Sequence, residues 1–391
     1  MALPIIPRIL LSRLQQTATW FPIVSLTGPR QSGKSTLVRE AFPDYRYVNL
    51  EDRQTRTEAL EDPVGFIRNK PNHLIIDEAQ YAPDLFSMIQ VVSDERNEPG
   101  QYILSGSQNF LLLKQIRQSL AGRVGLLKLL PLSYREITET SESEPLSTDE
   151  FMFSGGFPRM ITSGIPHDIF FHSYIDTYVE RDVAGYLDVR NTSAFRTFLE
   201  LCALNAGNLA NYTNLANDTG VSVPTVRSWM SILESSYVIF TLNPYYTNAR
   251  KRLTKTPKLY FHDTGLLCHL LGLTSLNDLL ESEYLGMVFE NLIVAETLKS
   301  QYNADREPRL YFYRDDSKIE VDLLDFTDRH SPVMAEIKSG QTYHDRYAKQ
   351  LLSIGQQLGI SAEHLYVVAR VANSYRHGNI NVSNTRDWLL R

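Results

Sequence analysis

Eight consecutive residues, 28–35, match the phosphate-binding pattern G-x-x-x-x-G-K-[ST] at every position. The apolar residues 21–27 before them predict a buried strand, and residues 36–40 predict the start of a helix. In this order, backbone N–H groups of the loop and helix N-terminus point at phosphate oxygens, Lys34 reaches the β- and γ-phosphates, and the Ser35 hydroxyl holds Mg²⁺. The alternative is a glycine turn with a structural role. The predicted nucleotide-binding residues are Gly28, Pro29, Arg30, Gln31, Ser32, Gly33, Lys34, Ser35 and Thr36.

Hydrolysis of a bound nucleotide also requires an acid that holds the metal and a group that orients the attacking water. Residues 73–76 predict an apolar strand, and Asp77 and Glu78 follow it directly. Parallel sheets place their sites at the carboxyl ends of their strands. We therefore expect Asp77 to hold Mg²⁺ through water and Glu78 to polarise the nucleophilic water for ATP hydrolysis. The alternative is a strand that ends in two solvated acids.

Two more residues are candidates for contact with the γ-phosphate. Residues 101–105 predict another strand, and Ser107 follows it as a small polar side chain that could sense this phosphate. A simple polar turn is the alternative. Arg123 lies between a predicted helix end and a strand, which suits an arginine finger that reaches the nucleotide of a neighbouring subunit. The alternative is an arginine that bonds the last carbonyls of its own helix.

The size and composition limit the class of protein. The chain has 391 residues, of which 43% are hydrophobic and 21% charged, and this predicts a globular protein of two to four domains. No apolar run approaches the roughly 18 residues that span a bilayer, and prolines interrupt the apolar start, so we expect a cytoplasmic protein without membrane contact. Cys202 and Cys268 lie in apolar stretches and are expected to be buried thiols. The net charge of −6 leaves nucleic-acid binding possible through local basic patches.

The chain resembles a known family along nearly its whole length. The phosphate loop, the Asp77 strand end and Arg123 are similar to those of the AAA+ ATPases. Later motifs resemble the prokaryotic family that joins an AAA ATPase domain to a C-terminal domain of unknown function, DUF4143. These motifs are residues 155–159, 178–182 and 258–266. The resemblance implies a P-loop core with a helical lid in a homo-oligomeric ring, since an arginine finger acts between subunits.

Within the lid, the resemblance implies that Pro158 packs on the adenine ring, because related ATPases carry a Gly-x-Pro element there. By residue chemistry alone, residues 156–158 form a tight turn. Arg159 or Arg181 is a candidate for phosphate contact from the lid. The polar, acidic residues 138–150 predict a loop that leads into the lid.

The middle of the chain predicts a helix-turn-helix. Residues 214–222 read as a short helix that ends in a glycine turn, and a second helix starts near Ser222. Residues 237–242 predict a strand, and the basic segment 246–258 could form a hairpin wing. The alternatives are a protein-interaction module and a solvated basic face. The predicted DNA-contacting residues are Ser222, Thr225 and Arg227 in a groove and Arg250, Lys251 and Arg252 on phosphates.

The C-terminal part predicts an amphipathic helix at residues 286–296 and strands at 318–325 and 332–338. An acid on one strand followed by Glu-x-Lys on the next resembles the PD-(D/E)xK nuclease superfamily. The resemblance implies that a divalent cation binds between strand acids, beside an activating lysine and a helix acid. The alternative is two strands whose charged residues face water. The residues concerned are Asp322 and Glu336 as metal ligands, Lys338 and Glu290.

The sequence therefore predicts an α/β protein with four parts. These are a P-loop AAA+ core at 1–135, a helical lid at 136–195, a winged helix at 196–275 and a restriction-endonuclease-like α/β domain at 283–391. We expect Mg²⁺-dependent ATP hydrolysis coupled to the binding and remodelling or processing of DNA, including branched DNA. The competing hypothesis is a nucleotide-controlled switch that binds a protein partner through an inactive nuclease-like domain.

Overall fold

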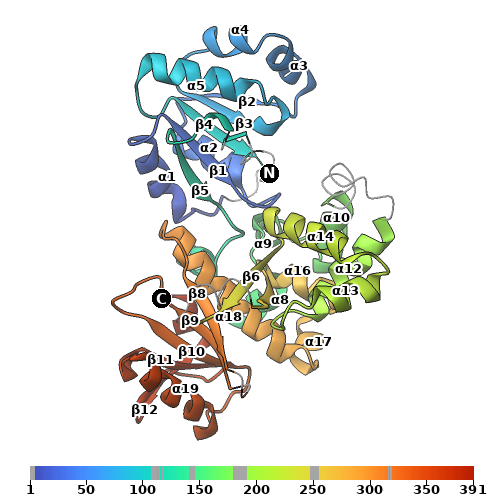
Figure 1. The fold of residues 1–391 in the computed structure, drawn as a ribbon, viewed down its shortest axis with the longest axis vertical. Coiled ribbons are helices and arrows are strands. Elements are labelled where there is room, and N and C mark those ends of the chain that lie inside the picture. The colour runs from blue at the N-terminus through green and yellow to red at the C-terminus, as the bar shows by residue number, and fades with distance from the viewer. Residues whose placement is uncertain are drawn as a thin grey trace.

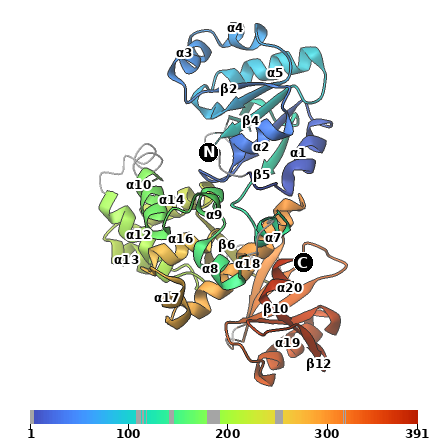
Figure 2. The same ribbon diagram turned by 180° about the vertical axis from the view of Figure 1, so that it is seen from behind.

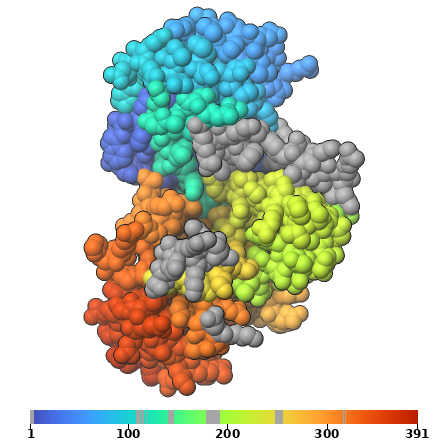
Figure 3. Space-filling model, viewed as in Figure 1, coloured from blue at the N-terminus to red at the C-terminus, as the bar shows by residue number. Residues whose placement is uncertain are grey.

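The computed structural model describes residues 5–106, 112, 115–116, 118–140, 146–178, 192–246, 255–315, 317 and 319–391. They form two lobes (Figure 1). The upper lobe contains a five-stranded sheet and the lower lobe an eight-stranded sheet with most of the remaining helices. Figure 3 shows this division on the molecular surface.

The upper lobe is a parallel sheet with strand order β2-β3-β4-β1-β5. Its strands are short runs rich in Ile, Leu and Val, as expected of parallel strands covered on both faces. Leu26 and Val24 pack on helices of one face, whereas Ile23 and Ile76 pack on helices of the other. The strands are β1 (Ile23–Thr27), β2 (Arg46–Asn49), β3 (Leu74–Asp77), β4 (Tyr102–Gly106) and β5 (Val124–Lys128).

Helices cover both faces of this sheet. The first face carries α1 (Leu10–Ala18) and α2 (Lys34–Ala41), and the second carries α4 (Pro63–Arg68) and α5 (Leu85–Arg96). Helix α3 (Arg53–Glu61) begins at Asp52, whose carboxylate accepts a hydrogen bond from the Thr55 N–H. Because all five strands are parallel, Thr27, Asp77 and Gly106 end at the same edge of the sheet.

The next helices described after the sheet are α7 (Tyr134–Thr140), α8 (Thr148–Ser154), α9 (Pro158–Ser163) and α10 (His167–Tyr178). The prediction of a loop over residues 138–150 is partly wrong, since both of its ends are helical. Ser147 and Glu150 form a capping box that starts α8 within this acidic run. Figure 2 shows α7 and α9 where the two lobes meet.

The glycine turn between α8 and α9 is held from a distant part of the chain. The Asp263 carboxylate accepts a hydrogen bond from the Gly156 N–H at 2.7 Å, and it also caps the helix α16 (Thr264–Leu270). A Cβ atom on Gly155, which has φ +72°, would lie 2.2 Å from an Asp263 oxygen. This contact joins the motifs at 155–159 and 258–266 into one structural unit.

The middle region consists of α12 (Thr192–Leu204), α13 (Tyr212–Thr219), α14 (Val223–Ser235), and the antiparallel strands β6 (Ile239–Pro244) and β7 (Lys258–Phe261). The predicted pair of helices around a glycine turn is confirmed. Gly220 has φ +68° and ends α13, and the Ser222 hydroxyl caps α14. The predicted strand is also present, but it begins at Ile239. Helix α17 (Leu276–Glu281) leads to the C-terminal part.

The C-terminal part shares its sheet with the middle region. The order is β12-β13-β11-β10-β9-β8-β6-β7, because Asn243 and Pro244 of β6 pair with β8. One hydrophobic core extends from Leu132 to Leu389. The added elements are α18 (Leu285–Asn303), β8 (Leu310–Arg314), β9 (Glu320–Asp325), β10 (Val333–Lys338), α19 (Asp345–Leu358), β11 (Leu365–Ala369), β12 (Tyr375–His377), β13 (Ile380–Asn384) and α20 (Thr385–Leu389).

Helix α18 differs from the predicted amphipathic helix, since its buried residues are distributed around its axis. One side packs in the lower-lobe core. Near its C-terminal end, buried Glu296 accepts a hydrogen bond from the Tyr134 N–H at 2.8 Å, and Lys299 donates to the Leu132 carbonyl at 3.2 Å. The helix thus ties the lower lobe to the segment that leaves the upper sheet. No helix among the described residues is long and apolar enough to cross a membrane.

Candidate functional site

The phosphate loop connects β1 to α2 as the sequence predicts. Gly33 has φ +93°, a conformation that favours glycine, and it is the residue before the first turn of α2. Gly28 passes so close to β5 that a Cβ atom there would lie 2.0 Å from the Leu129 carbonyl oxygen. Both glycines are therefore required by the backbone path of the loop.

Lys34 lies over the loop that it follows. Its ammonium group donates to the Gly28 carbonyl at 2.9 Å and to the Pro29 carbonyl at 2.6 Å, and the residue is buried. A lysine in this position brings a positive charge to the concave side of the loop. This is the charge that the γ- and β-phosphates of a nucleotide require.

Asp77 is the centre of a hydroxyl cluster at the carboxyl edge of the sheet. One of its oxygens accepts hydrogen bonds from Ser35 at 2.6 Å and Tyr47 at 2.7 Å, and the other accepts one from Ser105 at 2.6 Å. Burial, followed by the hydrogen bond to Asp77, raises the pKa of the Tyr47 phenol. Ser35 and Asp77, predicted as Mg²⁺-binding residues from distant parts of the chain, are in direct contact.

Sequence reasoning missed Tyr47 and Ser105. The order of the strands could not be deduced from one sequence, and it is this order that places β2 and β4 on either side of β3. Ser107, the predicted phosphate sensor, lies outside the described residues.

Glu78 follows Asp77 with a left-handed backbone, φ +53°, which turns the chain sharply after β3. Its carboxylate accepts a hydrogen bond from the Gln80 amide at 2.5 Å. The Gln80 side chain is buried, and its carbonyl oxygen has no hydrogen-bond partner among the described residues. Gln80 therefore fixes the orientation of Glu78 at the edge of the nucleotide cleft.

A cleft of ≈ 630 Å³ opens between the phosphate loop and the lid helices. Gly33, Lys34, Ser35 and Glu78 line one side. The other side is formed by the lid and the N-terminal segment, with Pro158, Arg159, Tyr174, Ile5 and Ile6 among its residues. Pro158 thus lines the same cleft as the loop, and its contact with adenine stays a prediction. Arg181 lies outside the described residues.

Arg8 connects the phosphate loop to the lid. Its guanidinium donates to the Ser32 carbonyl at 2.7 Å, the Leu130 carbonyl at 2.7 Å and the Glu136 carboxylate at 3.0 Å. Burial opposes the charge of Glu136, but Arg8 outweighs it and holds the pKa of this carboxyl below its usual value. A lone arginine near the N-terminus gave no sequence signal for this role.

Arg123 precedes β5 at the edge of the sheet opposite the phosphate loop, because Val124 pairs with Ile23 at the start of β1. Its guanidinium forms a bidentate ion pair with Asp94 of α5, at 2.6 and 2.8 Å. The side chain is about one-third exposed. Its predicted action on a neighbouring subunit would require this exposed pair to open.

The four residues predicted for the nuclease-like site lie on three adjacent elements. Lys338 of β10 bonds Glu336 at 2.7 Å and Asp322 of β9 at 3.3 Å. Glu290 of α18 instead bonds Lys258 and Tyr260 of β7. Lys258 and Tyr260 were missed as members of this cluster, since nothing in the sequence spacing shows that β7 lies beside α18.

The residues predicted to contact DNA are only partly described. Thr225 bonds the Ser222 hydroxyl at 2.8 Å in the first turn of α14. Arg227 is exposed on the same helix, and its guanidinium lies 5.1 Å from the centre of the Tyr212 ring. Arg250, Lys251 and Arg252 lie outside the described residues.

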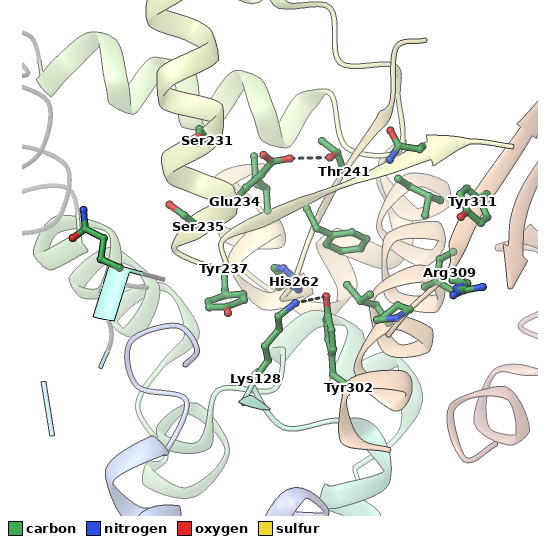
Figure 4. Close-up of a pocket in the computed structure, with 18 residues that line it drawn as sticks. Lys128, Ser231, Glu234, Ser235, Tyr237, Thr241, His262, Tyr302, Arg309 and Tyr311 are labelled. Carbon is green, nitrogen blue, oxygen red and sulfur yellow. Dashed lines mark hydrogen bonds between the residues drawn. The ribbon is translucent and has the colours of Figure 1, made fainter. Parts of the chain in front are cut away.

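A second cleft, of ≈ 820 Å³, lies where the upper lobe meets the middle and C-terminal regions (Figure 4). At its base Lys128 donates to the Tyr302 hydroxyl at 3.1 Å. The Tyr237 hydroxyl lies 2.8 Å from the hydroxyl of Thr27, the last residue of β1 before the phosphate loop. A direct polar contact therefore links the start of the loop to the turn between α14 and β6.

His262 lines this cleft and is a buried titratable group. Burial, with the nearby charges of Lys299 and Lys128, lowers its pKa to about 3. Between pH 6.5 and 3 the unfolded chain therefore binds a proton that the folded chain does not, and stability falls as the pH falls. At pH 4.5 this costs about 3 kcal/mol relative to pH 7.5.

We expect His262→Gln to remove this contribution. Urea unfolding of both proteins at pH 7.5 and 4.5 would show a smaller loss of stability on acidification for the variant. Equal losses in the two proteins would contradict the assignment of His262 as a group that stays neutral when folded.

Three family models match the chain. An AAA domain matches residues 21–138, a domain of unknown function (DUF8612) residues 146–277, and a domain of unknown function (DUF4143) residues 285–388. The cleft and the Asp77 cluster lie largely within the first.

Among known proteins, the chain is similar to the uncharacterized protein Rv2008c of Mycobacterium tuberculosis, with 32% identity over 321 residues, 80% of this chain and 69% of that protein. It is 24% identical over 353 residues to the uncharacterized protein MJ1544 of Methanocaldococcus jannaschii, 82% of this chain and 76% of that protein. A solved structure, the Walker-type ATPase PABY2304 of Pyrococcus abyssi, covers 68% of this chain and 96% of its own at 16% identity, with a TM-score of 0.45.

The likeness to Rv2008c covers 80% of this chain, and separate models match the AAA region and the C-terminal part. The parallel sheet, the phosphate loop and the Asp77 carboxylate at the end of β3 are features expected of an AAA domain. The chain belongs to the family of proteins that join an AAA domain to the C-terminal domain DUF4143.

Proposed function

We propose that this protein hydrolyses ATP with Mg²⁺ in the cleft between the phosphate loop and the lid. The observation that carries the proposal is the 2.6 Å contact between Ser35 and Asp77 at the edge of the sheet, beside Lys34 and Glu78. A hydroxyl and a carboxylate are suitable oxygen ligands for Mg²⁺. The donor set therefore fits this ion, which when bound neutralises negative charge on the phosphate oxygens.

The other groups of the site have separate roles in the proposed reaction. Backbone N–H groups of residues 28–35 cradle the phosphates, and Lys34 exchanges its bonds to the Gly28 and Pro29 carbonyls for bonds to phosphate oxygens. Glu78, oriented by Gln80, accepts a hydrogen bond from the attacking water and receives its proton as the γ-phosphate leaves ADP. In the proposed homo-oligomer Arg123 leaves Asp94 and adds positive charge at the nucleotide of the adjacent subunit.

We further propose that the middle region is a winged helix that binds DNA and that nucleotide turnover changes this binding. The exposed side of α14 carries Arg227, and the 13-residue helix is long enough to enter a major groove. The Tyr237–Thr27 hydrogen bond supports the coupling, since it joins the end of β1, before the loop, to the turn between α14 and β6. The basic residues 250–252 would contact phosphates, which position a protein without reading sequence.

Fluorescence anisotropy with a labelled duplex across a salt series tests the DNA proposal. We expect Arg227→Ala to weaken binding several-fold, because a contact in the groove is lost. Joint replacement of Arg250 and Lys251 by Ala should weaken binding and lower the salt slope by about 2, because two phosphate contacts are lost. The matched control is Arg346→Ala, which removes an exposed cation from α19.

Unchanged affinity and salt slope in both DNA variants would contradict the winged-helix assignment. ATP hydrolysis that proceeds normally while the wild type binds no duplex or four-way-junction DNA would instead favour the second candidate function. In that case the nucleotide state controls a protein partner, and the contact between Tyr237 and Thr27 carries the signal to a protein-binding surface.

A further inference from the structure

Lys258 of β7 occupies the centre of a partly buried cluster of charged side chains. Its ammonium group lies 2.6 Å from an oxygen of Glu320 and 3.1 Å from an oxygen of Glu290, and only 3% of the residue is exposed. The same Glu290 oxygen accepts a hydrogen bond from the Tyr260 hydroxyl at 2.6 Å. Lys258 and Tyr260, both in β7, therefore bond acids of α18 and β9.

The other half of the cluster is held by Lys338. This lysine bonds Glu336 at 2.7 Å and Asp322 at 3.3 Å, and the same Asp322 oxygen accepts a hydrogen bond from the Ile337 N–H at 2.8 Å. Arg314 bonds the second oxygen of Glu320 at 3.0 Å. Each of the four acids thus has at least one basic partner.

The charges of the cluster nearly cancel without an added ion. Four carboxylates face three cations, which gives a formal sum of −1. One oxygen of Glu336 is bonded by Lys338, and its second oxygen is buried without a hydrogen-bond partner among the described residues.

The divalent cation implied by a PD-(D/E)xK site does not fit these side chains. Such an ion needs several carboxylate or other oxygen atoms that converge on one point. Here the ammonium of Lys258 already bonds Glu290 and Glu320, and that of Lys338 bonds Glu336 and Asp322. The part of the chain that the structure describes contains no group of three or more His, Cys, Asp or Glu residues that could hold a metal ion.

We propose that Lys258 is the built-in counter-ion of this cluster and takes the place of a divalent cation. The cluster then acts as a metal-free ion-pair network that fastens the β6–β7 hairpin, and with it the middle region, to the C-terminal sheet. A partner-free buried carboxylate is costly, so the lysine and its acids are required together. Removing the ammonium while keeping the acids would open the cluster to a cation from solution.

Mn²⁺ binding to the full-length protein, followed by electron paramagnetic resonance without nucleotide, tests this proposal. The wild type is expected to show no Mn²⁺ site that depends on Glu290 or Glu336. Lys258→Met is expected to gain one such site, and adding Glu290→Gln to this variant should weaken it at least tenfold. The matched control, Lys255→Met, removes an exposed lysine of the same segment and should bind Mn²⁺ as the wild type does.

A wild-type Mn²⁺ site that Glu290→Gln or Glu336→Gln weakens tenfold would overturn the proposal. A folded Lys258→Met protein that gains no Mn²⁺ site would also overturn it. If Lys258→Met fails to fold, the wild-type protein tests the proposal instead. A rise in its melting temperature with Mn²⁺ that Glu336→Gln abolishes would show a metal centre and overturn the proposal. ATP hydrolysis measured in the same preparations reports separately on the proposed function.

Discussion

Replacing Glu78 by glutamine is expected to abolish most ATP hydrolysis while leaving ATP binding intact. The amide keeps the shape of the side chain but cannot take a proton from the attacking water. General-base catalysis of this kind contributes about 10²- to 10⁴-fold, so the turnover rate should fall by a similar factor. The phosphate loop, Lys34 and Asp77 are unchanged in this variant, and the affinity for ATP should stay within a few-fold of the wild type.

The measurement is steady-state phosphate release beside nucleotide binding by titration calorimetry. Glu61→Gln is the matched control, since Glu61 is an exposed acid at the end of α3. It should hydrolyse ATP at the wild-type rate. If Glu78→Gln retains more than about a tenth of the wild-type rate, another group activates the water, and the role of Glu78 is wrong.

Replacing Arg8 by methionine is expected to have the largest effect on stability. Arg8 and Glu136 form a buried ion pair, with side-chain exposures of 6% and 0%. Methionine keeps much of the apolar volume but leaves the Glu136 carboxylate, and the carbonyls of Ser32 and Leu130, without their charged donor. Loss of one partner of a buried pair costs roughly 3–5 kcal/mol.

Because Ser32 belongs to the phosphate loop, the same variant should also bind ATP more weakly. Urea unfolding measures the stability, and Arg53→Met, which changes an exposed arginine at the start of α3, is the control. A double variant that adds Glu136→Gln should recover part of the lost stability, since no charge is then left unpaired. A loss below about 1 kcal/mol in Arg8→Met would show that the pair is not a structural link.

The sequence predicted the phosphate loop, the Asp77 strand end and the glycine turn of the middle region well. In each case the signal is local, because glycines at fixed offsets, an apolar run or a cap act within about ten residues. Lys34, Ser35 and Asp77 were identified for this reason, and the structure brings them to one edge of the sheet.

The residues that were missed depend on contacts between distant segments. Ser105 and Tyr47 reach Asp77 because β4 and β2 flank β3, and Arg8 reaches Glu136 across 128 positions of sequence. Lys258 enters the C-terminal cluster because the middle hairpin continues the C-terminal sheet. A single sequence contains no local pattern for such pairings, and they were visible only in the three-dimensional fold.

The two corrections have different causes, since one depends on a contact between distant segments and the other on a local capping box. Helix α18 was expected to be amphipathic, but contacts on several sides bury it, including the bond from Glu296 to the backbone of Tyr134. The acidic run at 138–150 was expected to be a loop, but Ser147 caps a new helix within it. Composition alone showed neither the contact of α18 with the backbone of Tyr134 nor the helix cap at Ser147.

The proposal that ATP is hydrolysed with Mg²⁺ at the phosphate loop is tested by phosphate release. The wild type and Lys34→Ala are each measured with Mg²⁺ and with excess EDTA. We expect the wild type to hydrolyse ATP only with Mg²⁺. We expect Lys34→Ala neither to bind ATP nor to hydrolyse it under either condition. Wild-type protein that is folded and binds ATP but releases no phosphate, alone or with DNA, would contradict this proposal. Equal hydrolysis by Lys34→Ala would contradict it as well, because the activity would then lie outside the phosphate loop.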